Sequence, residues 1–70
     1  MKTYYYCELD NTGQRTGNYY SIELPVMFVI NRFGCEYCAF SIVHESGYIA
    51  DGGKTFLYSS ESEAIRAALS

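Results

Sequence analysis

The chain has 70 residues, 49% of them hydrophobic, and a formal net charge of −3 from eight acidic and five basic side chains. This length suits one domain with a small core, and it excludes a deep substrate cleft, whose walls would consume most of that core. The acid excess and the scattered bases argue against direct nucleic-acid binding, because a phosphate backbone requires a clustered basic face.

The first predicted hairpin is rich in tyrosine. Residues 3–9 alternate in the manner of a strand, and residues 19–24 do so again after a polar loop that contains glycine. The first strand directs its side chains to two faces, with Tyr4, Tyr6 and Glu8 on one and Tyr5, Cys7 and Leu9 on the other. We expect the Tyr4 face to be open, with the reverse assignment as the alternative, because tyrosine suits both a core and an interface. On the second strand, the side chains expected inside are Tyr20, Ile22 and Leu24, and those expected outside are Tyr19, Ser21 and Glu23.

Two apolar segments occupy the middle of the chain. Residues 25–30 hold the longest apolar run, and its β-branched residues favour a buried strand. A short helix from Pro25 to a cap at Gly34 is the alternative, because periodicity does not separate strand from helix in so short a run. Residues 36–44 alternate with apolar side chains on both faces, which predicts a central strand.

The segment after this strand predicts turns and short strands. Turns are expected at residues 45–47 and 51–53, where glycine lies beside polar residues. A short strand is expected between them over residues 48–50, and an extended segment over residues 55–58.

The C-terminal segment predicts a helix over residues 61–69. Ser60 and Glu63 have the spacing of a capping box, and apolar residues recur after them at helical intervals. So short a helix must dock on the sheet to be stable. The predicted fold class is therefore α+β: one domain over residues 1–70, with an antiparallel sheet of about four or five short strands and one C-terminal helix packed on one face.

A Cys-x-x-Cys pair is the most suggestive motif for a metal. Cys35 and Cys38 could hold a zinc ion together with Cys7 and His44, which would complete a tetrahedral set. Residues three apart in a strand point to opposite faces, however, so we expect a buried Cys38, a more exposed Cys35 and no metal. The four residues remain a minor alternative, and no cofactor is expected.

No catalytic constellation emerges from the sequence. Residues 52–55 imitate the end of a phosphate-binding loop, but its first glycine would fall on Tyr48. His44 is the single histidine, and its neighbour Glu45 would point to the opposite face of a strand. We therefore expect a protein that is not an enzyme.

The sequence carries no signal for export or for insertion into a membrane. The first six residues lack the charged and then apolar pattern of a signal peptide, and residues 25–30 are too few to cross a bilayer. We expect a cytoplasmic protein with no membrane partner.

These features favour a protein-binding module. The residues expected to contact the partner combine tyrosine and acidic side chains: Tyr4, Tyr6, Glu8, Asp10, Tyr19, Glu23, Glu36 and Asp51. In size, acidity and lack of chemistry the chain resembles small phage-encoded anti-defence proteins of the anti-CRISPR type. That resemblance implies a stoichiometric inhibitor that presents acidic residues to the basic channel of a host ribonucleoprotein effector. A structural or homodimerising domain is the alternative.

Overall fold

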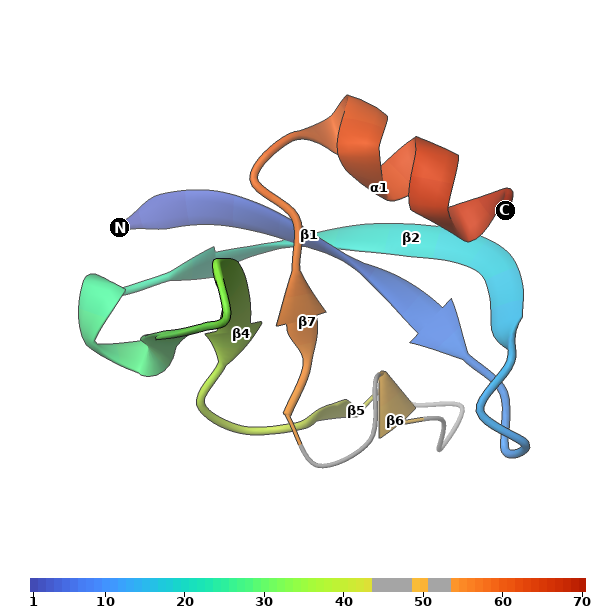
Figure 1. Cartoon of the computed structure of the whole chain (residues 1–70), viewed down its shortest axis with the longest axis horizontal. Coiled ribbons are helices and arrows are strands. Elements are labelled where there is room, and N and C mark those ends of the chain that lie inside the picture. The colour runs from blue at the N-terminus through green and yellow to red at the C-terminus, as the bar shows by residue number, and fades with distance from the viewer. Residues whose placement is uncertain (44–48, 51–53) are drawn as a thin grey trace.

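Antiparallel strands and one C-terminal helix build the fold (Figure 1), which confirms the predicted α+β class. The computed structural model describes residues 1–43, 49–50 and 54–70. Its elements are β1 (Lys2–Leu9), β2 (Arg15–Leu24), a 3-10 helix η1 (Val26–Phe28), β3 (Val29–Arg32), β4 (Cys35–Cys38), β5 (Ile42–Val43), β6 (Ile49–Ala50), β7 (Phe56–Leu57) and α1 (Glu61–Ala68).

The predicted first hairpin is present as β1 and β2. The register places Tyr4 opposite Ile22 and Tyr6 opposite Tyr20, and it shifts after Cys7. Helix α1 lies along one face of this hairpin (Figure 1), and the Cys7 thiol donates a hydrogen bond of 3.5 Å to the Ala64 carbonyl there. The Tyr5 and Cys7 face of β1 is therefore the one that the helix covers.

Strand β7 connects the two larger sheets. Strands β3, β4 and β7 form one sheet in that order, with Glu36 opposite Leu57 and Tyr37 opposite Phe56. The next residue, Tyr58, bridges to Tyr5 of β1 through reciprocal backbone hydrogen bonds of 2.9 and 2.7 Å. The order of neighbouring strands is thus β2, β1, β7, β4 and β3, with the isolated bridge at Tyr58 joining the two sheets.

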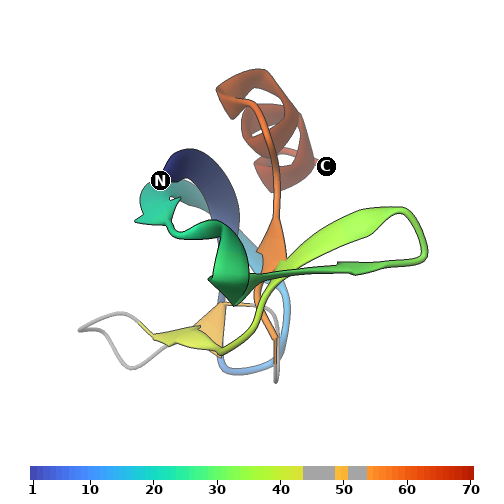
Figure 2. The same cartoon turned by 90° about the vertical axis from the view of Figure 1, so that its left-hand side faces the viewer.

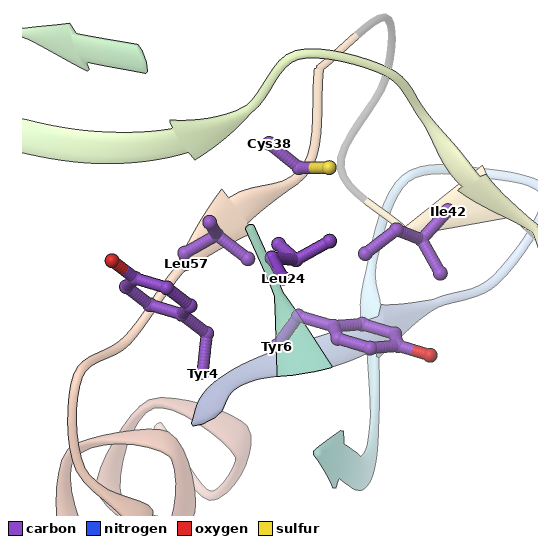
Figure 3. Packing of buried hydrophobic residues seen from close by; sticks show 6 residues of the cluster. All are labelled: Tyr4, Tyr6, Leu24, Cys38, Ile42 and Leu57. Carbon is purple, nitrogen blue, oxygen red and sulfur yellow. The ribbon is translucent and has the colours of Figure 1, made fainter. Parts of the chain in front are cut away.

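The core lies between the first hairpin and this second sheet. Its buried cluster contains side chains from both, together with Ile42 of β5 (Figure 3): Tyr4, Tyr6, Leu24, Cys38, Ile42 and Leu57. Thr55 is fully buried beside the cluster; its carbonyl accepts from the Cys38 amide at 2.7 Å and its hydroxyl from the Ile42 amide at 2.8 Å. These bonds satisfy the polar groups of Thr55 in an apolar setting.

The predicted strand over residues 25–30 is wrong in its first half. Pro25 cannot donate to a strand ladder, and its carbonyl accepts from the Phe28 amide at 3.0 Å, which closes the turn η1. Val26 and Met27 are 81% and 78% exposed, so this part of the run is not buried either. Strand β3 begins only at Val29.

The predicted central strand over residues 36–44 is also interrupted. Strand β4 ends at Cys38 and β5 begins at Ile42, with a bend between them. The Ala39 amide still donates to the Phe28 carbonyl at 2.8 Å, which continues the β3–β4 register by one residue. The ladder is left by Ile42, whose amide donates to the Thr55 hydroxyl and which pairs with Ala50 of β6.

The later elements agree with the sequence where the structure describes them. Ile49 and Ala50 form β6, which pairs with β5, whereas Tyr48 and the turns predicted at residues 45–47 and 51–53 lie outside the described residues. Helix α1 starts as predicted, because the Ser60 hydroxyl accepts from the Glu63 amide at 3.3 Å.

Arg15 ties the far end of the first hairpin to the C-terminal end of α1. Its guanidinium donates to the Ala67 carbonyl at 3.0 Å and to the hydroxyls of Ser70 and Tyr58 at 3.3 Å each. A cation at this end of a helix also complements the helix dipole.

Candidate functional site

The face predicted to bind a partner is buried. Tyr4, Tyr6 and Glu8 are 3%, 5% and 6% exposed, so the expectation of an open Tyr4 face is wrong and the reverse assignment holds. The physical reason is that this face packs against the second sheet, where tyrosine rings supply the area that a small core needs. Burial, and then the nearby Glu36 carboxylate, raises the pKa of the Tyr4 hydroxyl, which donates to Glu36 at 3.3 Å.

Glu8 is buried within a polar network at the irregular end of the hairpin. Its carboxylate accepts from the Thr16 hydroxyl at 2.9 Å, the Asn18 amide group at 3.0 Å and the Tyr20 hydroxyl at 3.3 Å. Tyr20, expected in the core, lies at its margin and is 36% exposed. These bonds let a charge remain inside, so Glu8 is engaged in holding the hairpin together.

The other predicted contact residues are dispersed. Asp10 holds its own turn, because its carboxylate accepts from the Thr12 and Gln14 amides at 2.9 and 3.0 Å. Tyr19 is half-buried and donates to Glu61 at 3.2 Å. Three further acids were predicted to share this surface: Glu23 is exposed, Glu36 is half-buried against Tyr4, and Asp51 lies outside the described residues.

The four residues considered for zinc do not converge where the structure describes them. Cys7 faces α1, whereas Cys38 lies in the core cluster on the other side of the first hairpin. All three cysteines are free thiols, of which Cys35 alone is half-buried rather than buried. His44 lies outside the described residues, and within those described no group of three or more His, Cys, Asp or Glu could hold a metal ion.

A different surface brings exposed chemistry together: the side of the second sheet that faces away from the core. Alternation along β4 and β7 sends Cys38 and Leu57 inward, so Tyr37 and Phe56 point outward. Their rings meet edge to face with centroids 5.2 Å apart. We call this surface the outer face; by strand alternation it comprises Ile30, Arg32, Cys35, Tyr37 and Phe56, and Lys54 joins it because it lines a pocket with Arg32 and Tyr37.

The hairpin that carries the outer face ends in an exposed phenylalanine. Strands β3 and β4 extend away from the rest of the chain (Figure 2), and the two-residue turn between them is Phe33 and Gly34. Both have positive φ, 52° and 78°, as a type I′ turn requires. Gly34 adopts this conformation without strain, but Phe33 does so against the steric preference of its Cβ, and its side chain is 100% exposed.

A surface pocket lies beside the turn. It has a volume of about 450 Å³ and is lined by Arg32, Phe33, Tyr37 and Lys54. Neither the Arg32 guanidinium nor the Lys54 ammonium has an ion-pair or hydrogen-bond partner among the residues that the structure describes. Two cationic groups and two aromatic rings therefore share one concave surface.

A second exposed patch lies at the base of the hairpin. Val26 and Met27 of η1 project into solvent, and the rings of Phe28 and Phe40 meet edge to face at 5.9 Å while remaining 40% and 46% exposed. We call these four residues the η1 patch. Its polar content is low, so it offers area for contact without any reactive group.

The sequence contained a signal for the protruding hairpin that the first interpretation missed. A glycine follows Phe33, and apolar or alternating segments flank the pair on both sides, which is the pattern of a two-residue turn. Asn or Asp normally precedes that glycine in such a turn, so the phenylalanine at this position did not indicate a turn in the sequence. The same phenylalanine makes the turn unusual.

These two surfaces offer contact area and charge for binding another molecule. The outer face supplies aromatic area and positive charge, and the η1 patch supplies apolar area. Within the described residues, no helix is long and apolar enough to cross a membrane. Comparison with known proteins gives no matching family model, no matching curated protein and no matching solved structure.

Proposed function

We propose that the chain is a small non-enzymatic protein-binding module whose contact site is the β3–β4 hairpin with Phe33 as its anchor. The observation that carries this proposal is the state of Phe33, fully exposed and held at a φ of 52°. An exposed ring contributes no burial to folding, and a bulky residue at positive φ costs on the order of 1–2 kcal/mol. The ring therefore adds nothing to the isolated fold and its backbone conformation weakens it, and both features are explained if the ring is buried in a partner.

The hairpin has the form of an aromatic anchor on a rigid support. Interfaces derive most of their binding energy from a few central residues, aromatic ones prominent among them. A two-residue turn fixes the direction of Phe33, so little conformational entropy is lost when the ring enters a pocket. Tyr37 and Phe56 on the outer face extend the contact area beside it.

As the finer role we propose stoichiometric inhibition of a larger host complex that handles nucleic acid. The shape of the molecule supports this role, because a protruding hairpin can enter and occupy a cleft of a partner. The acidic face once expected for such an inhibitor lacks Glu8, which is buried, and Asp10, which holds a turn. We therefore propose that the β3–β4 hairpin, and not an acidic face, makes the inhibitory contact.

The test is a comparative pull-down from a lysate of the cells in which the chain acts. Wild type is compared with Phe33→Ala, and Leu69→Ala serves as the control because it also removes an exposed apolar side chain, away from the hairpin and from the η1 patch. Circular dichroism verifies that each variant is folded. We expect partners to be retained by Leu69→Ala and lost from Phe33→Ala. Equal recovery by both variants contradicts the hairpin as the contact site.

A second candidate function, homodimerisation, is favoured by the η1 patch. Exposed apolar residues gathered over one short segment are typical of a surface that is covered by another chain. Sedimentation of wild type and of Met27→Asp measures this directly. A dimer that dissociates in Met27→Asp supports the candidate, and a monomeric wild type at about 100 μM, a concentration at which a stable dimer forms, rejects it.

A further inference from the structure

We infer that the pocket beside Phe33 binds an acidic peptide segment of the partner, with Arg32 and Lys54 receiving its carboxylates. This inference rests on the proposed protein-binding function and specifies the chemistry of the partner. It concerns the pocket of about 450 Å³ that Arg32, Phe33, Tyr37 and Lys54 line.

The first reason is that the described residues give the side chains of these two cations no partner. Arg15 holds the C-terminal end of α1, and the Lys2 ammonium lies 5.0 Å from the centre of the Tyr4 ring. The Arg32 and Lys54 side chains, by contrast, have no hydrogen-bond or ion-pair partner within residues 1–43, 49–50 and 54–70, and they line the same pocket. Two like charges on one concave surface repel each other, and an anion placed between them removes that repulsion.

The second reason is that the walls of the pocket strengthen a charge interaction. Tyr37 is half-buried, and its ring is fixed against Phe56 at a centroid distance of 5.2 Å. Aromatic walls exclude water from one side of a bound carboxylate, so its attraction to the cations is screened less than on an open surface. Arg32 can also hold a carboxylate with two parallel hydrogen bonds.

The third reason concerns the class of macromolecule. A nucleic acid presents phosphates in succession, and the chain as a whole carries −3, with only two cations at this site. A peptide with two acidic residues beside an apolar one matches the site better. Its carboxylates meet Arg32 and Lys54, and its apolar side chain packs on Tyr37 and Phe33.

The experiment uses a defined probe, a fluorescein-labelled peptide of sequence Glu-Glu-Leu-Glu-Glu, with the Gln-Gln-Leu-Gln-Gln peptide as its neutral match. Fluorescence anisotropy measures the binding of each to the full chain. We expect binding of the acidic peptide, weaker binding as salt rises from about 50 mM to about 500 mM, and little binding of the neutral one. Equal binding of the two peptides, or of neither, overturns the inference.

Variants assign the binding to the pocket. Arg32→Gln with Lys54→Gln should weaken the acidic peptide by about tenfold, the scale of two partly exposed ion pairs. Arg66→Gln is the matched control, because it removes an exposed cation of α1 away from the pocket. Arg32→Lys, with Lys54 unchanged, should bind the acidic peptide more weakly than wild type but more tightly than the double Gln variant. It keeps the positive charge and loses the two parallel hydrogen bonds of the guanidinium. An equal loss in Arg66→Gln overturns the assignment.

One further readout tests whether the pocket takes nucleic acid instead of a peptide. Stronger binding of single-stranded oligothymidine than of the acidic peptide, lost in the double Gln variant, overturns the inference in favour of nucleic acid. If the acidic peptide fails while the pull-down still depends on Phe33, the inference falls and the proposed function stands.

Discussion

Replacing Phe33 by Asn should stabilise the isolated protein. The turn places this residue at a φ of 52°, where asparagine is readily accommodated and phenylalanine is strained. The lost ring is 100% exposed, so its removal forfeits no buried area within the chain. Asn followed by Gly34 is also the preferred sequence for a type I′ turn.

The expected magnitude follows from these two observations. Left-handed conformation costs an ordinary residue about 1–2 kcal/mol, and asparagine recovers part of that cost through local hydrogen bonds. We therefore expect a gain of about 1 kcal/mol in the free energy of unfolding. For a domain of this size such a gain raises the melting temperature by about 4–8 °C.

Urea unfolding followed by circular dichroism measures the change, with Phe33→Ala as the control. Alanine removes the ring but keeps the Cβ that causes the strain, so its stability should stay close to that of wild type. A Phe33→Asn variant that is no more stable than Phe33→Ala would refute the claim that strain resides in this turn. A gain in stability together with loss of the partner would show that the strain is maintained for binding.

Three further predictions concern the rest of the molecule. Ser60→Ala should lower the free energy of unfolding in urea by about 1 kcal/mol, because the Glu63 amide loses its cap, whereas Ser59→Ala should have little effect. Stability should fall as pH rises above about 10, because burial raises the pKa of Tyr4 and Tyr6 above the ordinary value of about 10 that tyrosine has in the unfolded chain. The folded state then keeps the tyrosine protons to a higher pH than the unfolded state does. The stabilisation from the two protonated tyrosines is therefore complete below about pH 10 and is lost as the pH rises through their folded pKa. A melting temperature that stays constant while the buried tyrosines ionise contradicts this prediction. Cys35 should react with a thiol reagent before Cys7 and Cys38, and simultaneous reaction of all three in the native state disagrees with their burial.

The sequence predicted local structure well where one physical signal dominated. Ser60 and Glu63 mark the start of α1, because a hydroxyl cap and a nearby amide need only short-range geometry. Alternation in residues 3–9 likewise placed Tyr4 and Tyr6 on one face and Cys7 on the other. These features depend on neighbours in the chain, which the sequence displays directly.

The burial of each face depended on segments far apart in the chain. Tyrosine serves both as core and as surface, so nothing in residues 3–9 shows that Tyr4 meets Leu57 while Cys7 meets α1. The interruption between Cys38 and Ile42 likewise involves a distant group, because the Ile42 amide donates to the Thr55 hydroxyl and not to a backbone carbonyl of a neighbouring strand. A side-chain acceptor so far along the chain leaves no periodic pattern in residues 36–44.

The bridge between Tyr5 and Tyr58 has a consequence for how the chain is made. A ribosome makes β1 before β7, so Tyr5 lacks its backbone partner until Tyr58 has emerged. Helix α1 follows β7, so the Cys7 face of the first hairpin also stays uncovered until α1 has emerged. A two-stranded hairpin alone is at best marginally stable in water. Residues 1–70 should therefore fold in a single event once α1 has emerged, and arrested chains that lack Tyr58 should be digested by protease as unfolded polypeptide.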